Sequence, residues 1–221
     1  MKFSFKNDYS EGCHPKILEA LSQYNLDQQN GYGLDIYSEN AANIIREKSK
    51  SPESKVHLVS GGTQANLIVI SSILRPHESV VSANTGHIFT NETGAIEATG
   101  HKVHGVETKD GKLRPEDIQN VLDVHTNVPH QVKQKLVYIS NSTEVGTIYT
   151  KKELENLSEF CKKKNLYLFM DGARLGHALT AKSNDVNWED IARLTDAYYL
   201  GGTKNGALIG EAIVINNKNL Q

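Results

Sequence analysis

The chain has 221 residues with a formal net charge of -2, and its 38% of hydrophobic residues is enough for one sizeable packed domain. The near-neutral charge gives no reason to expect nucleic acid as a partner, and no uncharged apolar run approaches the roughly 18 residues of a membrane span. Two cysteines do not make a disulfide framework, and the N-terminus lacks an apolar signal segment, so we expect a cytoplasmic protein.

Residues 1–50 predict an extended N-terminal arm followed by helices at 15–23 and 38–50. Residues 51–221 alternate short apolar runs with helical segments and form a large domain. The predicted strands are 56–60, 79–83, 101–106, 136–140, 167–171, 197–200 and 211–215. The predicted helices are 64–74, 91–99, 115–124, 150–164, with a capping box of Thr150 and Glu153, and 187–194. This alternation predicts an α/β fold, a mostly parallel sheet sandwiched by helices.

In such a sheet, ligands bind beyond the carboxyl ends of the strands, so the residues that follow each strand are candidates for a site. Gly61, Gly62 and Thr63 follow the first strand and open a helix, whose free N–H groups could bind a phosphate. An ordinary strand-to-helix turn is the other interpretation. His87 follows the second strand and could stack on a flat ring or move a proton, although a polar loop histidine fits equally well.

Asp171 ends an apolar strand, so its carboxylate should be partly buried and paired. Arg174 is one candidate partner; alternatively, Asp171 meets a cationic ring nitrogen and Arg174 an anionic oxygen. Lys204 lies among glycines and apolar residues without an acidic neighbour in sequence, so it is either a solvated charge or an amine nucleophile. The ordered set of phosphate-binding turn, histidine, aspartate and lysine matches the groups that pyridoxal phosphate needs.

Several stretches of the sequence resemble the threonine aldolase family, which is part of the aspartate-aminotransferase-like, fold-type I group of pyridoxal-phosphate enzymes. The stretches are SGGTQAN at 60–66, the histidine at 87, YLFMDGARLGHA at 167–178 and YYLGGTKNGALIGEA at 198–212. The resemblance extends over nearly the whole chain. It implies that residues 51–221 are the large, transferase-like domain that binds pyridoxal 5'-phosphate.

By this resemblance, Lys204 would hold the cofactor covalently, His87 would stack on its ring, and Asp171 would bond the ring nitrogen. Arg174 would contact the cofactor's phenolic oxygen and the substrate carboxylate, and Asn7 would lie in the arm that reaches the substrate. The implied catalytic residues are Lys204 and His87. The implied cofactor-binding residues are Gly61, Gly62, Thr63, His87, Asp171, Arg174 and Lys204.

The sequence departs from the family pattern in two places. The family often has a histidine after the strand at 136–140, whereas this chain has the run Asn141, Ser142, Thr143 and Glu144, which leaves the acceptor of the substrate-hydroxyl proton open. Family members also continue into a small C-terminal domain, and because this sequence ends at Gln221 we expect it to lack that domain. A naturally short product and a fragment both stay open.

The implied function is a lyase of amino-acid metabolism that cleaves L-threonine or a related β-hydroxy-α-amino acid to glycine and an aldehyde. The expected partners are a small amino-acid substrate and other copies of the chain, in a homodimer or homotetramer with shared active sites, with no nucleic acid and no membrane. Another fold-type I reaction, β-elimination or transamination, and a truncated inactive fragment remain alternatives. We expect no metal, because His101 and His104, the closest histidine pair, should point to opposite faces of a strand.

Overall fold

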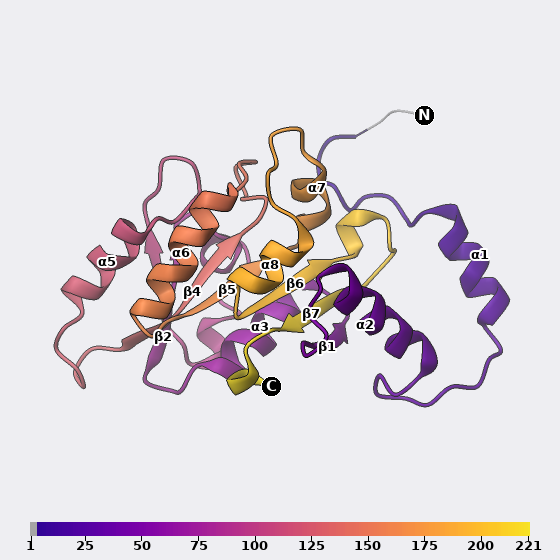
Figure 1. Cartoon of the computed structure of the whole chain (residues 1–221), viewed down its shortest axis with the longest axis horizontal. Helices are drawn as coiled ribbons and strands as arrows, with labels where there is room; N and C mark the ends of the chain where they lie inside the picture. The colour runs from indigo at the N-terminus through magenta and orange to yellow at the C-terminus, as the bar shows by residue number, and fades with distance from the viewer. Residues whose placement is uncertain (1–3) are drawn as a thin grey trace.

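The computed structural model describes residues 4–221, which form a seven-stranded sheet with helices packed on both of its faces (Figure 1). The strand order across the sheet is β1-β7-β6-β5-β4-β2-β3. The strands are β1 (Lys55–Val59), β2 (Glu78–Ala83), β3 (Val103–Val106), β4 (Lys133–Ser140), β5 (Tyr167–Asp171), β6 (Ala197–Gly201) and β7 (Glu211–Ile215).

Parallel pairing extends from β3 through β2, β4 and β5 to β6, which confirms the mostly parallel sheet predicted from the sequence. The exception is β7, which runs antiparallel to both β6 and β1. A glycine-rich loop connects β6 directly to β7, so no crossover helix is needed between these two strands. This loop lies at the same end of the sheet as the residues that follow β5.

The helices match most of the predicted segments. They are α1 (Pro15–Tyr24), α2 (Ile36–Lys48), α3 (Gly62–Ile73), α4 (His87–Thr90), α5 (Pro115–Val124), α6 (Lys151–Lys163), α7 (Leu175–Thr180) and α8 (Trp188–Leu194), with 3-10 turns η1 (Glu97–Thr99), η2 (Thr203–Asn205) and η3 (Lys218–Leu220). The predicted capping box is confirmed at α6, where Thr150 accepts from the backbone of Glu153 and the Glu153 side chain accepts from the Thr150 backbone. The sequence prediction missed α7.

The helix predicted at 91–99 is wrong. Helix α4 begins earlier, at His87, and ends at Thr90, and only the single turn η1 follows. Thr93 has φ 51° and Gly94 has φ 77°, both in the left-handed region, which a right-handed helix excludes. The segment therefore does not form a continuous helix, although Gly100 ends η1 in the left-handed conformation.

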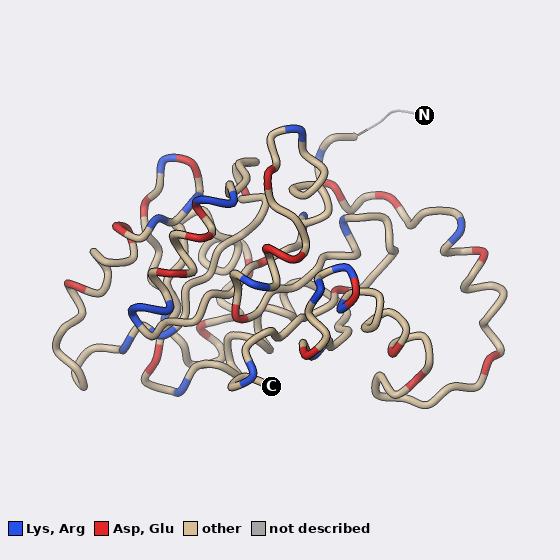
Figure 2. Tube along the Cα trace, in the orientation of Figure 1, with Lys and Arg blue, Asp and Glu red and all other residues tan. Residues whose placement is uncertain are grey.

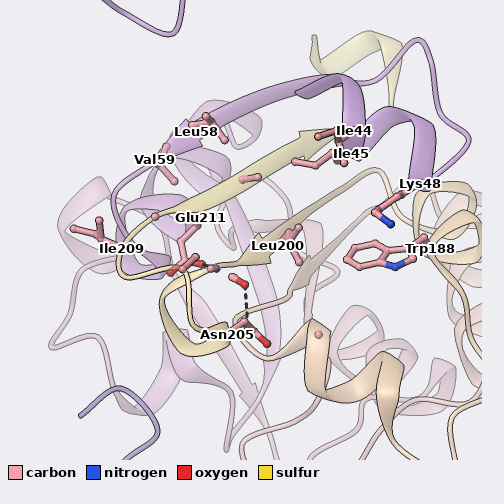
Figure 3. Close-up of a pocket in the computed structure, with 16 residues that line it drawn as sticks. Ile44, Ile45, Lys48, Leu58, Val59, Trp188, Leu200, Asn205, Ile209 and Glu211 are labelled. Atoms are coloured by element: carbon pink, nitrogen blue, oxygen red, sulfur yellow. Dashed lines mark hydrogen bonds between the residues drawn. The ribbon is translucent and has the colours of Figure 1, made fainter. Parts of the chain in front are cut away.

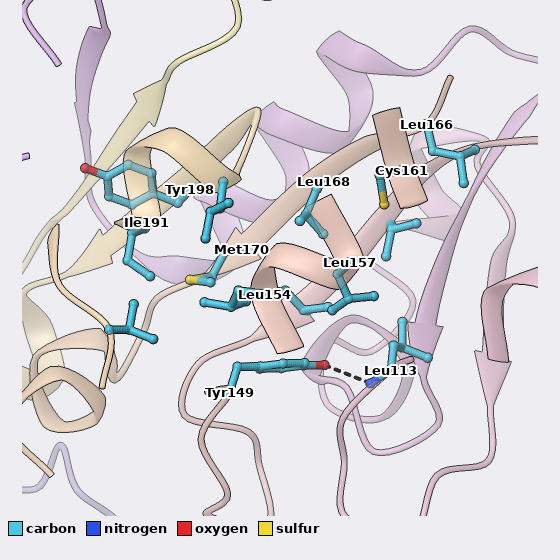
Figure 4. Packing of buried hydrophobic residues seen from close by; sticks show 14 of the residues in the cluster. Leu113, Tyr149, Leu154, Leu157, Cys161, Leu166, Leu168, Met170, Ile191 and Tyr198 are labelled. Atoms are coloured by element: carbon cyan, nitrogen blue, oxygen red, sulfur yellow. Dashed lines mark hydrogen bonds between the residues drawn. The ribbon is translucent and has the colours of Figure 1, made fainter. Parts of the chain in front are cut away.

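Two apolar clusters form the core, one on each face of the sheet, because alternate residues of each strand point to opposite faces. On one face, Leu154, Leu157 and Cys161 of α6 pack with Leu168 and Met170 of β5 (Figure 4). On the other face, β5 contributes Phe169, which packs with tyrosines of β4 and β6 against α3. Asp171 lies two residues after Phe169, so its side chain points to the α3 face of the sheet.

Acidic and basic residues are interspersed along the chain (Figure 2). No helix within residues 4–221 is both long and apolar enough to cross a membrane. Helix α1 has no buried residue and lies at one end of the molecule, away from the sheet, whereas α2 lies beside β1 and β7 (Figure 1).

Candidate functional site

A cavity of about 440 Å³ lies beyond the carboxyl ends of β4, β5 and β6. Its lining brings together every cofactor-binding residue predicted from the sequence, namely Gly61, Gly62, Thr63, His87, Asp171, Arg174 and Lys204. These residues come from four separate segments of the chain, at 61–63, 87, 171–174 and 204. The fold thus assembles the predicted set at one place, as expected for the carboxyl edge of a parallel sheet.

Asp171 is buried, with 4% of its surface exposed, and its carboxylate accepts four hydrogen bonds. Oδ1 accepts from the Tyr199 hydroxyl at 2.6 Å and from the Ala173 backbone N–H at 2.9 Å. Oδ2 accepts from the Tyr138 hydroxyl and from Asn66 Nδ2, the latter at 3.2 Å. Neutral donors fix the orientation of this carboxylate, so its negative charge remains available to a cationic group in the cavity.

The ion pair suggested between Asp171 and Arg174 is wrong, because Arg174 pairs with Asp8 of the N-terminal arm. Arg174 Nη2 donates to Asp8 Oδ1 at 2.9 Å, and Nε donates to Asp8 Oδ2. The hydrogen bond with Arg174 lowers the pKa of Asp8, and the bond with Asp8 raises the pKa of Arg174. Sequence proximity pointed to the wrong acid, since the actual partner lies 166 residues away.

The N-terminal arm reaches the cavity through Tyr9, whose ring centroid lies 5.8 Å from Lys204 Nζ. Asn7, which the family resemblance assigned to the substrate, does not line the cavity. Its Oδ1 accepts from the Tyr9 N–H at 3.1 Å and from the Ser10 hydroxyl at 2.7 Å, so it stabilises the turn that presents Tyr9. The substrate contact of Asn7 stays a prediction.

His87 opens α4, and its Nδ1 lies 3.1 Å from Glu92 Oε1. Glu92 is buried, with 6% of its surface exposed, and the same oxygen accepts from Asn66 Nδ2 at 2.9 Å. The hydrogen bond with Glu92 raises the pKa of His87 against the opposing effect of burial. Asn66 therefore connects the histidine–glutamate pair to Asp171, a link that sequence reasoning missed because these residues lie on different elements.

The first turn of α3 is suited to an anion. Gly61 caps this 12-residue helix without a side-chain hydrogen bond, and its first intrahelical bond is donated by Ala65. Within residues 4–221, the N–H groups of 62–64 have no hydrogen-bond partner. A Cβ atom on Gly62 would lie 2.8 Å from the Tyr199 hydroxyl, so only glycine permits this close approach between α3 and β6.

Lys204 lies in η2, on the loop between β6 and β7, and is partly buried. Within the described part of the chain, its ammonium group forms no ion pair. Glu211 fixes the loop, since its Oε2 accepts from the Gly202 N–H at 2.7 Å, and burial raises the pKa of this glutamate. A Cβ atom on Gly202 would lie 2.4 Å from the Gly210 carbonyl oxygen, so the two arms of the loop approach as closely as glycine allows.

The polar groups that line the 440 Å³ cavity fit pyridoxal phosphate. The cofactor carries a phosphate, an aldehyde and a ring nitrogen that is cationic when protonated. The cavity offers N–H donors without partners at the start of α3, an unpaired amine at Lys204 and a buried carboxylate at Asp171. This donor set is chemically complementary to all three groups.

A second cavity, of about 590 Å³, lies on the other side of the β6–β7 loop and is lined mostly by apolar side chains (Figure 3). Ile44 and Ile45 of α2, Leu58 of β1 and Trp188 of α8 contribute to it. Glu211 belongs to the lining of both cavities. The predicted cofactor-binding residues line the smaller, more polar of these two cavities.

The family model of the beta-eliminating lyases matches residues 10–221. The chain belongs to the beta-eliminating lyase family.

Among the relatives of this chain is the low-specificity L-threonine aldolase of Pseudomonas aeruginosa, 32% identical over 221 residues. The alignment covers 98% of the chain and 62% of that relative, so the chain spans about three fifths of the length of the curated protein. A solved threonine aldolase structure from Leishmania major is 53% identical with a TM-score of 0.98, covering 100% of this chain and 64% of that one. The resemblance to threonine aldolases predicted from the motifs is confirmed.

The likeness to an aspartate aminotransferase mutant of Thermus thermophilus shows the fold alone. It has a TM-score of 0.74 at 20% identity and covers 96% of this chain and 55% of that one. The predicted aminotransferase-like architecture of the large domain is confirmed by this match.

Proposed function

We propose that this chain forms the cofactor-binding part of a pyridoxal-phosphate-dependent aldolase that cleaves L-threonine or a related β-hydroxy-α-amino acid to glycine and an aldehyde. The observation that carries the proposal is the convergence of Asp171, Lys204 and the first turn of α3 on one cavity. The relatives that are threonine aldolases support the choice of reaction.

Each residue has a separate task in this proposal. The N–H groups at Gly62 and Thr63 would bind the phosphate, and the Lys204 amine would hold the cofactor covalently. Asp171 keeps a proton on the ring nitrogen, because its carboxylate is fixed and anionic. Arg174 binds the substrate carboxylate. When bound, pyridoxal phosphate supplies a cationic ring that withdraws electrons from the Cα–Cβ bond.

The cofactor assignment is tested by reducing the purified protein with borohydride in the presence of pyridoxal phosphate and mapping the modified peptide. We expect the label on Lys204 and its loss in Lys204→Ala. Lys182→Ala is the matched control, because Lys182 is exposed and does not line the cavity. A label on another lysine would overturn the assignment.

The reaction is tested by the products formed from L-threonine. We expect glycine and acetaldehyde in equal amounts. A 2-keto acid in their place would support β-elimination or transamination, which use the same lysine and aspartate, and would overturn the aldolase proposal.

We further infer a cytoplasmic protein that assembles into a homodimer or homotetramer. Both cysteines are free thiols, which supports a reducing compartment. Large apolar residues are exposed on α1 and the following loop, which supports contact with another copy; they include Leu18, Leu21, Tyr24, Leu26 and Tyr32. Light scattering tests the assembly, and a monomer at working concentration would overturn it.

A further inference from the structure

Glu144 is a carboxylate of the cavity that has no place in the proposed set of cofactor contacts. It follows β4 and lines the same cavity as Asp171 and Lys204. Its Oε1 accepts two hydrogen bonds, from the His87 backbone N–H at 2.9 Å and from the Ser140 hydroxyl at 2.7 Å. Two elements, α4 and β4, therefore fix the position of this side chain.

The second oxygen of Glu144 is free. Within residues 4–221, Oε2 accepts no hydrogen bond, and it is not among the fully enclosed polar atoms that lack a partner. Since the side chain lines the cavity, Oε2 is the oxygen that a bound molecule can reach. Ser140 and the His87 N–H orient the carboxyl group without using the lone pairs of this atom.

The surroundings of Glu144 favour its protonated form more than water does. Burial raises the pKa of this carboxyl, and the negative charge of Asp171 adds to the effect. Two other titratable groups interact with its charge, Tyr138 of β4 and Arg174, which follows β5, whereas His87 acts on it through its backbone N–H. A carboxyl group with a raised pKa is a more effective base than an ordinary glutamate, because its affinity for a proton is greater.

His87 is less suited to take a proton from a substrate. Its Nδ1 is engaged with the buried carboxylate of Glu92, and this contact raises the pKa of the imidazole. A larger share of the histidine is then cationic and unable to accept a proton. The contact with Glu92 also fixes the plane of the ring, which suits a stacking role.

We propose that Glu144 Oε2 accepts the proton of the substrate's β-hydroxyl group during Cα–Cβ cleavage. This inference rests on the proposed aldolase function. The O–H bond breaks and its electron pair forms the second bond of the aldehyde carbonyl, while the Cα–Cβ pair stays with the glycine fragment. Glycine gains one proton at Cα for the proton that the hydroxyl oxygen gives up, so atoms and electrons balance.

The variant Glu144→Gln isolates this role. The amide oxygen of glutamine still accepts from His87 N–H and Ser140, so the loop keeps its anchor, whereas the group at the position of Oε2 becomes an NH₂ that cannot take a proton. The matched control is Glu159→Gln, which makes the same charge change at an exposed position of α6. Circular dichroism spectra of both variants check that the fold is retained.

We expect Glu144→Gln to lower kcat for L-threonine by about 100-fold or more, the range of general-base catalysis, with a smaller change in KM. Glu159→Gln should behave as wild type. Exchange of the glycine Cα proton in heavy water, followed by NMR, needs no hydroxyl group and should persist in Glu144→Gln. Equal loss of cleavage and exchange, or no loss of cleavage, would overturn the role of Glu144. A wild type that exchanges glycine but releases no aldehyde would instead overturn the aldolase function.

A second readout does not depend on turnover. In infrared difference spectra of wild type against Glu144→Gln, the carboxylic-acid band of Glu144 should appear at a higher pH than an ordinary glutamate, whose pKa is about 4.3. A midpoint at or below that value would contradict a carboxyl group poised to accept a proton.

Discussion

Replacing Tyr199 by phenylalanine removes one of the four hydrogen bonds that the Asp171 carboxylate accepts. The Tyr199 hydroxyl is 2.6 Å from Asp171 Oδ1, and the side chain is 1% exposed. A hydrogen bond to a charged group contributes about 1.5–3 kcal/mol, and the substitution removes one oxygen without leaving a large void. We therefore expect the free energy of unfolding to fall by about 1.5–3 kcal/mol at neutral pH.

The control is Tyr198→Phe in the neighbouring position of β6. Tyr198 is also buried but points to the opposite face of the sheet, and its hydroxyl has no hydrogen-bond partner within residues 4–221. Loss of an unpaired buried hydroxyl should leave stability unchanged or raise it slightly. Urea unfolding, followed by circular dichroism with a constant m-value, measures both. Equal destabilisation by the two substitutions would refute the assignment of the energy to the Asp171 contact.

Three further outcomes are expected. Thr150→Ala should destabilise the protein by about 1 kcal/mol in urea, because α6 loses its capping box, whereas Thr150→Ser should not. By NMR, His87 should titrate above 6.5 and return toward it in Glu92→Gln. Since the folded-state pKa is raised, the His87–Glu92 contact stabilises the fold below about pH 6.5, and this stability is lost as pH rises through the raised pKa. Gly62→Ala should lower the melting temperature of the cofactor-free protein through its clash with Tyr199, whereas Gly61→Ala, with open space around it, should not.

The sequence predicted the strands and longer helices well because their signals are local. The capping residues of α6 and the proline that opens α5 act within one turn of their helices. The segment 91–99 was mispredicted because the sequence does not reveal that Thr93, a residue other than glycine, adopts the left-handed backbone conformation. The antiparallel direction of β7 was not predicted either. The direction of a strand depends on the connection that precedes it and not on the composition of the strand.

The candidate site could be predicted at positions where the cofactor requires one particular residue type, such as an amine for its aldehyde or a carboxylate for its ring nitrogen. Lys204 and Asp171 are of this kind, and they do line one cavity. The contacts of Asn66 with Glu92 and Asp171, and of Asp8 with Arg174, were missed because each joins residues that are distant in sequence. Their roles follow only from contacts across the fold, such as the pair of Asp8 with Arg174.

The position of β7 in the sheet also determines the order in which the chain can fold during synthesis. Strand β1 pairs with β7 alone, and about 150 residues separate the end of β1 from the start of β7. At roughly 5–20 residues per second, the ribosome needs about 8–30 s to make them. During that interval the backbone of β1 lacks its partner and can pair with other nascent chains. The same strand that brings Glu211 to the β6–β7 loop therefore also ends the interval in which β1 lacks its partner.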